Sequence, residues 1–226
     1  MARPTRADKL THRLLSNPDC ADDGTLANEL LREFQRGAPL ENLRVLLTSP
    51  VDKVAMAGAF ILDELGAKGR PVIGDVVALL HRSNKHIRGH AIGSLLTCTT
   101  RENLKEIGAV ILLLEDRDWP IRWKTMEFLS LARPEQLKAG LDYFISNNPS
   151  SEHIQCLRWL LSDHGSNARE IHSWLQSDDL LKRKYAVVAA ARIVSVNRMP
   201  LEWAVCLKDE DVRRFADTML TVALDT

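Results

Sequence analysis

Two short segments of the chain carry side chains that could bind a ligand or do chemistry. The stretch from His81 to His90 contains three histidines and three basic residues, with no acidic residue among them. The segment from Asp118 to Trp123 places Trp119 and Trp123 one helical turn apart, with Arg122 between them. Imidazoles bind metals and transfer protons, whereas tryptophan and arginine are enriched in the hot spots of protein interfaces.

The histidine segment does not predict a metal site. His86 and His90 are four positions apart, so they share one face of a helix. Two histidines alone make a poor metal site, and the neighbouring positive charges oppose a cation. We therefore expect no metal and no cofactor. Two interpretations of this segment are left: a basic patch that faces a partner, or a solvated surface.

Signatures of catalysis are missing from the sequence. It contains no GxSxG, P-loop, GxGxxG or HExxH pattern, so we expect no catalytic residue and no enzyme. The four cysteines are far apart and form no CxxC pair. We expect them to be free thiols in a reducing compartment, with disulfides or metal ligation as the alternatives.

Charge and hydropathy restrict the classes of partner. The 226 residues include 30 basic and 30 acidic ones, and 45% are hydrophobic, as in an ordinary globular protein. Proteins that hold nucleic acid through its phosphates usually carry a basic excess, so the balance argues against that partner. No apolar run could span a membrane or serve as a secretory leader. We therefore expect a cytoplasmic protein without a membrane partner.

The elements that must position these side chains are helices. Apolar residues recur at spacings of three and four, and alternating strand patterns are nearly absent. Helical stretches of 10–16 residues alternate with short turns, and the pattern repeats. Apolar anchors at Val54, Ile87 and Ile121 are 33 and 34 residues apart, and Val212 occupies an equivalent place near the C-terminus.

The residue type at each position of the repeat has a physical reason. A small residue four positions after the anchor lets two helices cross closely, and a leucine eight positions after it fills the core. We expect N-caps at Ser49, Ser83, Asp118 and Asp209. The anchor is ambiguous between 150 and 195, where His153 or Ile154, and then Leu181 or Lys182, could serve.

This pattern resembles the HEAT-repeat superfamily, whose second helix often reads apolar-Arg-x-x-Ala-x-x-x-Leu. The resemblance is sharp at Ile87, Ile121 and Val212, and looser at Val54, where Ala55 replaces the arginine. It implies an all-α, right-handed alpha-alpha superhelix (solenoid) of about six HEAT-like helix pairs with an N-terminal helical cap. We expect the cap in residues 1–38 and one continuous solenoid in 39–226. The helix pairs are expected near 39–66, 70–98, 101–132, 134–163, 166–194 and 198–224.

The resemblance also suggests where a partner would bind. In such solenoids the arginine after each anchor commonly pairs with an acid of the adjacent repeat, which favours a structural role for Arg88, Arg122 and Arg213 over ligand contact. The second helices line the concave face, so bulky residues outside their core stripe would be exposed there. We expect the partner-binding residues to be Met56, Phe60, His86, His90, Trp119, Trp123, Lys124, Glu127 and Trp159. Within the concave stripe of Met56, Phe60, Trp123 and Trp159, exposure is expected most of all for Trp123.

The expected function is a non-catalytic module that binds another protein, in one specific form a bacterial immunity or inhibitor protein that neutralises a toxin or enzyme domain. A second interpretation is a DNA-binding enzyme similar to the HEAT-like alkylpurine DNA glycosylases, since Asp118, Trp119, Arg122 and Trp123 supply the residue types of a base trap. The catalytic aspartate motif of that family has no match in this sequence. A third is similarity to HEAT-like lyases and chaperones of tetrapyrroles, which no residue specifically favours.

Overall fold

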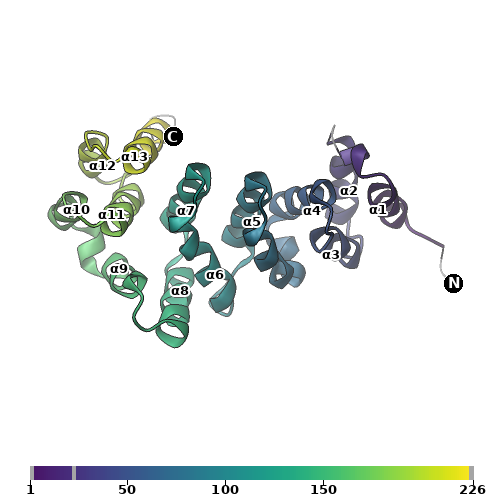
Figure 1. Ribbon diagram of the computed structural model, residues 1–226, viewed down its shortest axis with the longest axis horizontal. Helices are drawn as coiled ribbons and strands as arrows, with labels where there is room; N and C mark the ends of the chain where they lie inside the picture. The colour runs from purple at the N-terminus through teal and green to yellow at the C-terminus, as the bar shows by residue number, and fades with distance from the viewer. Residues whose placement is uncertain (1–2, 22–23, 224–226) are drawn as a thin grey trace. The chain divides into compact units, whose positions relative to one another are not determined.

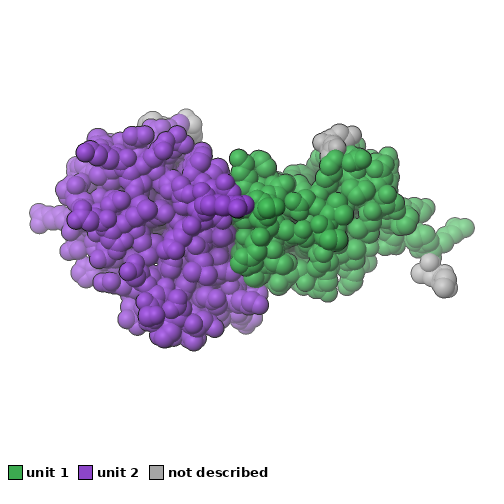
Figure 2. Space-filling view, viewed as in Figure 1, with its two compact units in different colours: residues 1–99 green, residues 100–226 purple. Residues whose placement is uncertain are grey.

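The computed structural model describes residues 3–21 and 24–223, and every regular element in these ranges is a helix (Figure 1). The prediction of an all-helical chain is therefore confirmed for the described residues. Within the same ranges, no helix combines the length and the apolar character that crossing a membrane requires. The chain divides into two compact units, residues 1–99 and 100–226, which are coloured separately in Figure 2. The two units are described in turn.

The first unit contains two rows of helices. Its elements are α1 (Arg6–Ser16), η1 (Pro18–Ala21), α2 (Thr25–Gln35), α3 (Glu41–Leu47), α4 (Asp52–Leu65), the 3-10 helix η2 (Gly66–His81) and α5 (Lys85–Cys98). One row consists of α1, α3 and η2, and the other of α2, α4 and α5, with α4 in contact with both of its neighbours. The second row contains the helices that carry the repeat anchors Val54 and Ile87.

Close helix crossing in the first unit depends on the small residue that the repeat pattern predicts. The anchor Val54 is buried, and so is Leu62 eight positions later. A Cβ atom at Gly58 would lie 2.9 Å from Leu46 Cβ and 3.0 Å from the backbone nitrogen of Leu47. Only glycine lets α4 approach α3 this closely, because any side chain would overlap the backbone of α3.

The second unit contains more helices and a different arrangement. Its elements are α6 (Leu104–Leu112), η3 (Leu113–Glu115), α7 (Trp119–Leu131), α8 (Pro134–Asn147), α9 (Glu152–Leu161), η4 (Asp163–Ser166), α10 (Ala168–Leu175), α11 (Leu180–Arg192), α12 (Met199–Ala204) and α13 (Glu210–Val222). Helix α11 contacts α7, α9, α10, α12 and α13, so it lies in the middle of the unit. Its Tyr185 is fully buried, as are all the alanines and valines between 186 and 190.

The second unit closes on itself through its second helices. Helix α7 packs against α11 and α13, which follow it by two and three helix pairs in the sequence (Figure 1). Two long basic side chains of α11 support this closure. Lys184 donates to the carbonyl oxygen of Leu114 at 2.6 Å, and Arg192 donates to the carbonyl oxygens of Leu129 and Ala132 at 2.8 Å each. Arg192 thus caps the C-terminal end of α7, where carbonyl groups lack partners within the helix.

The repeat register between residues 150 and 195 is settled by burial and by one hydrogen bond. In α9, His153 is buried, and so is Leu157 four positions later, as the repeat requires of an anchor and of the residue four positions after it. His153 is therefore the anchor. In α11, Arg183 donates to the carbonyl oxygen of Ser177, six positions earlier. Arg88 and Arg122 make the same bond six positions back, which places Lys182 at the anchor position of α11.

The helix starts differ in part from the expected N-caps. Asp209 caps α13 by accepting from the backbone N–H of Val212, as predicted. Asp118 stands at the N-cap of α7 without a side-chain capping bond.

The predictions for Ser49 and Ser83 are wrong: α4 begins after Val51, and α5 is capped by Asn84, which accepts from the N–H of His86. Asparagine takes this role because its side-chain carbonyl accepts as readily as a serine hydroxyl.

Candidate binding pocket

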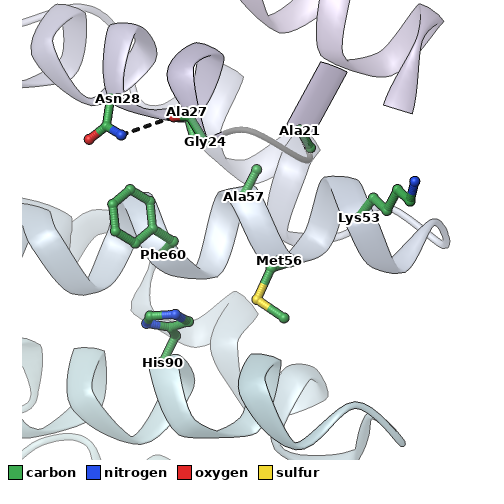
Figure 3. A pocket seen from close by; sticks show the side chains of 9 residues that line it. All are labelled: Ala21, Gly24, Ala27, Asn28, Lys53, Met56, Ala57, Phe60 and His90. Carbon is green, nitrogen blue, oxygen red and sulfur yellow. Dashed lines mark hydrogen bonds between the residues drawn. The ribbon is translucent and has the colours of Figure 1, made fainter. Parts of the chain in front are cut away.

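A pocket of about 410 Å³ opens on the second row of helices in the first unit. Figure 3 shows its lining, which comes from the end of η1, from the N-cap and first turn of α2, from one face of α4 and from α5. The lining residues are Ala21, Gly24, Ala27, Asn28, Lys53, Met56, Ala57, Phe60 and His90. Three of them, Met56, Phe60 and His90, are residues that the sequence predicts as partner-binding.

The periodicity of α4 explains why its side chains meet in this pocket. Lys53, Met56, Ala57 and Phe60 follow one another at spacings of three, one and three, so they project from one face of the helix. The opposite face carries the buried anchor stripe of Val54. Met56 and Phe60 are half-buried, because they lie between the core stripe and the solvent. They therefore form an apolar wall that a ligand can reach.

His90 is held in the pocket by two neighbours from α4. Its Nδ1 lies 3.0 Å from Oδ2 of Asp63, and its ring meets that of Phe60 edge to face, with centroids 5.8 Å apart. Asp63 fits there because α5 has a glycine at position 93: a Cβ atom at Gly93 would overlap the Asp63 carboxylate. Since a carboxylate only accepts, Nδ1 carries the proton and the ring orientation is fixed.

The rest of the basic segment serves the fold. Arg82 donates to the carbonyl oxygen of Ser49 at 2.5 Å and forms an ion pair with Asp52 at 3.2 Å, which joins two successive turns. Arg88 is buried and donates to the carbonyl oxygens of Arg82 and Ser83. His86 is exposed and is not among the lining residues of the pocket. Among the described residues, no group of three or more side chains could hold a metal ion.

The tryptophan segment of α7 is largely covered by α13. Trp123 is half-buried, and its ring meets that of Phe215 at a centroid distance of 5.8 Å. Trp119 stays 43% exposed, with the Arg214 guanidinium 5.0 Å from its ring centre. Trp123 is thus only partly exposed, because α13 packs over it where the second unit closes on itself.

Arg122 also takes part in the contact between α7 and α13. It forms a two-point ion pair with Asp211, with nitrogen-to-oxygen distances of 2.5 and 2.9 Å, and this partner raises the pKa of the guanidinium above its usual range. Arg183 pairs similarly with Asp209 at 3.1 Å. The acid that pairs with Arg122 therefore belongs to a helix pair three further along the chain, and not to the adjacent repeat as expected. With its arginine paired and Trp123 covered, this segment does not form the open base trap of a glycosylase.

The remaining predicted site residues belong to the second unit and are not among the residues that line the pocket. Lys124 and Glu127 form an ion pair with each other on α7, at 2.5 Å. Trp159 is only 8% exposed, and its ring stacks on that of Trp174 with centroids 3.9 Å apart. The expectation of an open groove around Trp159 is wrong, because Trp174 from α10 covers this face of α9. Burial of this side chain follows from tertiary packing that helical periodicity does not reveal.

Buried titratable groups in the second unit belong to its core. His153 is buried, stacks on Phe144 at 4.9 Å and lies 3.0 Å from the hydroxyl of Tyr185. Burial, with the nearby charge of Lys184 as a smaller cause, lowers the pKa of His153 to about 4. Burial likewise raises the pKa of the Cys156 thiol to about 12. A neutral imidazole and a protonated thiol are the forms expected of packing residues, not of a nucleophile and its base.

The second unit also has a polar cavity, of about 580 Å³, between the turns that precede α11 and α13. Its principal charged groups, Arg183 and Asp209, pair with each other. Sequence reasoning did not identify the small and polar residues that complete the pocket in the first unit, namely Ala21, Gly24, Ala27, Asn28, Lys53 and Ala57. Helical periodicity could have identified Lys53 and Ala57, because they lie on the same face of α4 as Met56 and Phe60.

Comparisons with known proteins define the fold. The sequence matches no protein-family model, and a search of curated proteins also finds no match. Among solved structures, a HEAT-like repeat protein from Thermococcus onnurineus NA1 aligns with a TM-score of 0.50 at 15% identity, over 99% of each chain. A designed armadillo repeat protein in complex with the peptide (KR)4 aligns with a TM-score of 0.52 at 14% identity, over 97% of this chain and 100% of the other. The chain therefore has the fold of the HEAT- and armadillo-like helical repeats.

Proposed function

We propose that this chain, which has a HEAT/armadillo-like repeat fold, is a non-catalytic module that binds another protein through the second helices of its first unit. The observation that carries the proposal is the pocket in which Met56, Phe60 and His90 meet. Repeat folds leave the surface of one helix row free to vary while the other residues form the core. In the second unit, α13 covers part of α7, and Trp123 packs on Phe215 instead of lining a pocket.

The composition of the pocket fits protein recognition. It joins a half-buried aromatic ring and a methionine with three polar side chains, Asn28, Lys53 and His90. Interfaces concentrate their binding free energy in such clusters of aromatic residues within a polar rim. The designed armadillo neighbour was solved with a peptide, which supports a peptide or protein as the class of ligand. Its peptide is basic, whereas the apolar lining described here favours an uncharged contact.

A selection from a displayed random-peptide library tests this function. Peptides that bind the wild-type chain are expected to lose at least tenfold in affinity with Phe60→Ala, because removal of a hot-spot aromatic costs about 2 kcal/mol of binding free energy. Val45→Ala is the matched control, since Val45 is 47% exposed on α3, in the other helix row of the same unit. Equal binding to the wild type and Phe60→Ala across all selected peptides would refute the proposal.

The specific form that we propose for this function is inhibition of a toxin or enzyme domain, as an immunity protein masks its target. The balanced charge of the chain supports a partner other than nucleic acid. Coexpression with a growth-arresting toxin domain from the same genome is expected to restore growth, and Phe60→Ala is expected to abolish the rescue. Rescue that is unaffected by Phe60→Ala would place toxin binding elsewhere on the chain.

A further inference from the structure

We propose that the pocket of the first unit receives one aromatic side chain with a hydrogen-bond donor, a tyrosine or tryptophan of the partner protein. This inference rests on the proposed function and specifies the chemistry of its central contact. It follows from three properties of the pocket: the small residues that leave it open, the rings and sulfur that form its apolar wall, and the acceptor groups that lie at its edge.

The volume of the pocket suits a ring. Four of its lining residues are alanine or glycine, namely Ala21, Gly24, Ala27 and Ala57, and they leave the space between α2 and α4 unfilled (Figure 3). A cavity of about 150 Å³ is enough to hold benzene. The 410 Å³ found here therefore accommodates a phenol or an indole with room for the chain that carries it.

The wall of the pocket consists of groups that favour an aromatic occupant. The rings of Phe60 and His90 meet at an interplanar angle of 81°, so a third ring can stack on one of them and meet the edge of the other. Met56 adds a polarizable thioether, and sulfur makes favourable contacts with aromatic rings. An aliphatic occupant would gain the burial of apolar surface without these oriented contacts.

The polar edge of the pocket selects for a donor. Asp63 accepts the Nδ1 proton of His90, so Nε2 is an acceptor in the tautomer that has its single proton on Nδ1, and this nitrogen has no hydrogen-bond partner among the described residues. Asn28 uses its amide nitrogen to bind the carbonyl oxygen of Gly24, which leaves its side-chain oxygen as a second acceptor. A tyrosine hydroxyl or an indole N–H supplies the donor that these acceptors require, and a phenylalanine ring does not.

Methyl NMR of the full chain with ¹³C-labelled methionine provides the test. The probes are the N-acetyl amides of tyrosine, tryptophan, phenylalanine, leucine and arginine. We expect the first two to shift the Met56 methyl signal upfield in a saturable manner with the lowest Kd values, because a ring bound beside Met56 shields it. Met199, which is 50% exposed in the second unit, is the internal control and is expected to stay unchanged.

Two variants separate the ring contact from the hydrogen bond. His90→Phe keeps a ring and removes the acceptor, so the Kd of the tyrosine amide is expected to rise about fivefold while that of the phenylalanine amide stays the same. Phe60→Ala is expected to weaken every aromatic probe. Equal or tighter binding of the leucine or arginine amide would overturn the inference, and so would the absence of any Met56 shift. Tighter binding of free zwitterionic tryptophan than of its capped amide would also overturn it, because it would indicate a small-molecule site.

The two proposals can fail separately. If displayed peptides still depend on Phe60 while no aromatic amide shifts Met56, the proposed function stands and the aromatic occupant is wrong. If the aromatic amides bind as described but no peptide or protein depends on Phe60, the pocket has the inferred chemistry and the proposed protein-binding function is wrong.

Discussion

Arg122 and Asp211 form a two-point ion pair although 89 positions separate them in the sequence. Arg122 lies in the first turn of α7 and Asp211 in the first turn of α13, and both side chains are mostly buried. In a simple helical repeat each helix pair contacts only the next one. This ion pair therefore marks the place where the second unit departs from a simple repeat and closes on itself.

Asp211→Asn is expected to lower the free energy of unfolding by about 2 kcal/mol, because it leaves the Arg122 guanidinium partly buried without its countercharge. Urea denaturation followed by circular dichroism measures the loss. Glu210→Gln is the matched control: Glu210 pairs with Arg214 at the surface of the same helix, and exposed pairs of this kind contribute less than about 0.5 kcal/mol. Similar effects of the two substitutions would show that the Arg122 ion pair does not stabilise the closure.

Trp123→Ala is expected to destabilise the second unit by about 2 kcal/mol, since it removes a half-buried ring that packs on Phe215. Trp119→Ala is expected to change stability by less than about 1 kcal/mol, because Trp119 is exposed and contacts mainly the Arg214 cation. Thermal unfolding of both variants checks the difference. A melting temperature unchanged by Trp123→Ala would mean that α13 does not cover this tryptophan in solution.

Gly58→Ala is expected to destabilise the first unit by about 2 kcal/mol, because the added methyl group would overlap Leu46 and the backbone at Leu47. Gly89→Ala is expected to have the opposite effect on stability. Nothing lies within 4 Å of a Cβ atom built at Gly89, and alanine is the better helix former, so a gain of about 0.5–1 kcal/mol is expected. Chemical denaturation of both variants measures the two effects, and a gain for Gly58→Ala would contradict the close crossing of α3 and α4.

His153 is expected to make the stability of the second unit depend on pH. The unfolded histidine, with a pKa of 6.5, binds a proton below that pH, whereas the folded one binds it only below about 4. Unfolding therefore takes up a proton between these values, and stability falls as the pH drops through this window. From pH 7 to pH 5 the expected loss from this residue is about 2 kcal/mol.

Denaturation of His153→Gln at both pH values tests this, because the variant is expected to lack that share of the pH dependence. His86→Gln is the control, since His86 is exposed. An unchanged pH dependence in His153→Gln would show that the imidazole is not buried in its neutral form.

Local sequence pattern was enough to predict the helices, the repeat and its core. The anchors Val54, Ile87, Ile121 and Val212 are all buried as predicted, because a period of 3.6 residues and short turns are local properties that the chain displays directly. The small residue at Gly58 was readable for the same reason. The apolar wall of the pocket was also readable, since Met56 and Phe60 are large apolar residues that lie outside the anchor stripe of their helix.

Which of these off-stripe residues stay accessible depends on the packing of helices that are distant in the sequence. Met56 and Trp123 hold the same position, two residues after their anchors, yet Met56 lines a pocket and Trp123 is covered by Phe215. Helical periodicity predicts that both residues lie on the same side of their respective helices, but it does not predict which other helix packs over them. That depends on contacts between residues far apart in the chain, such as Arg122 with Asp211, which no local pattern encodes.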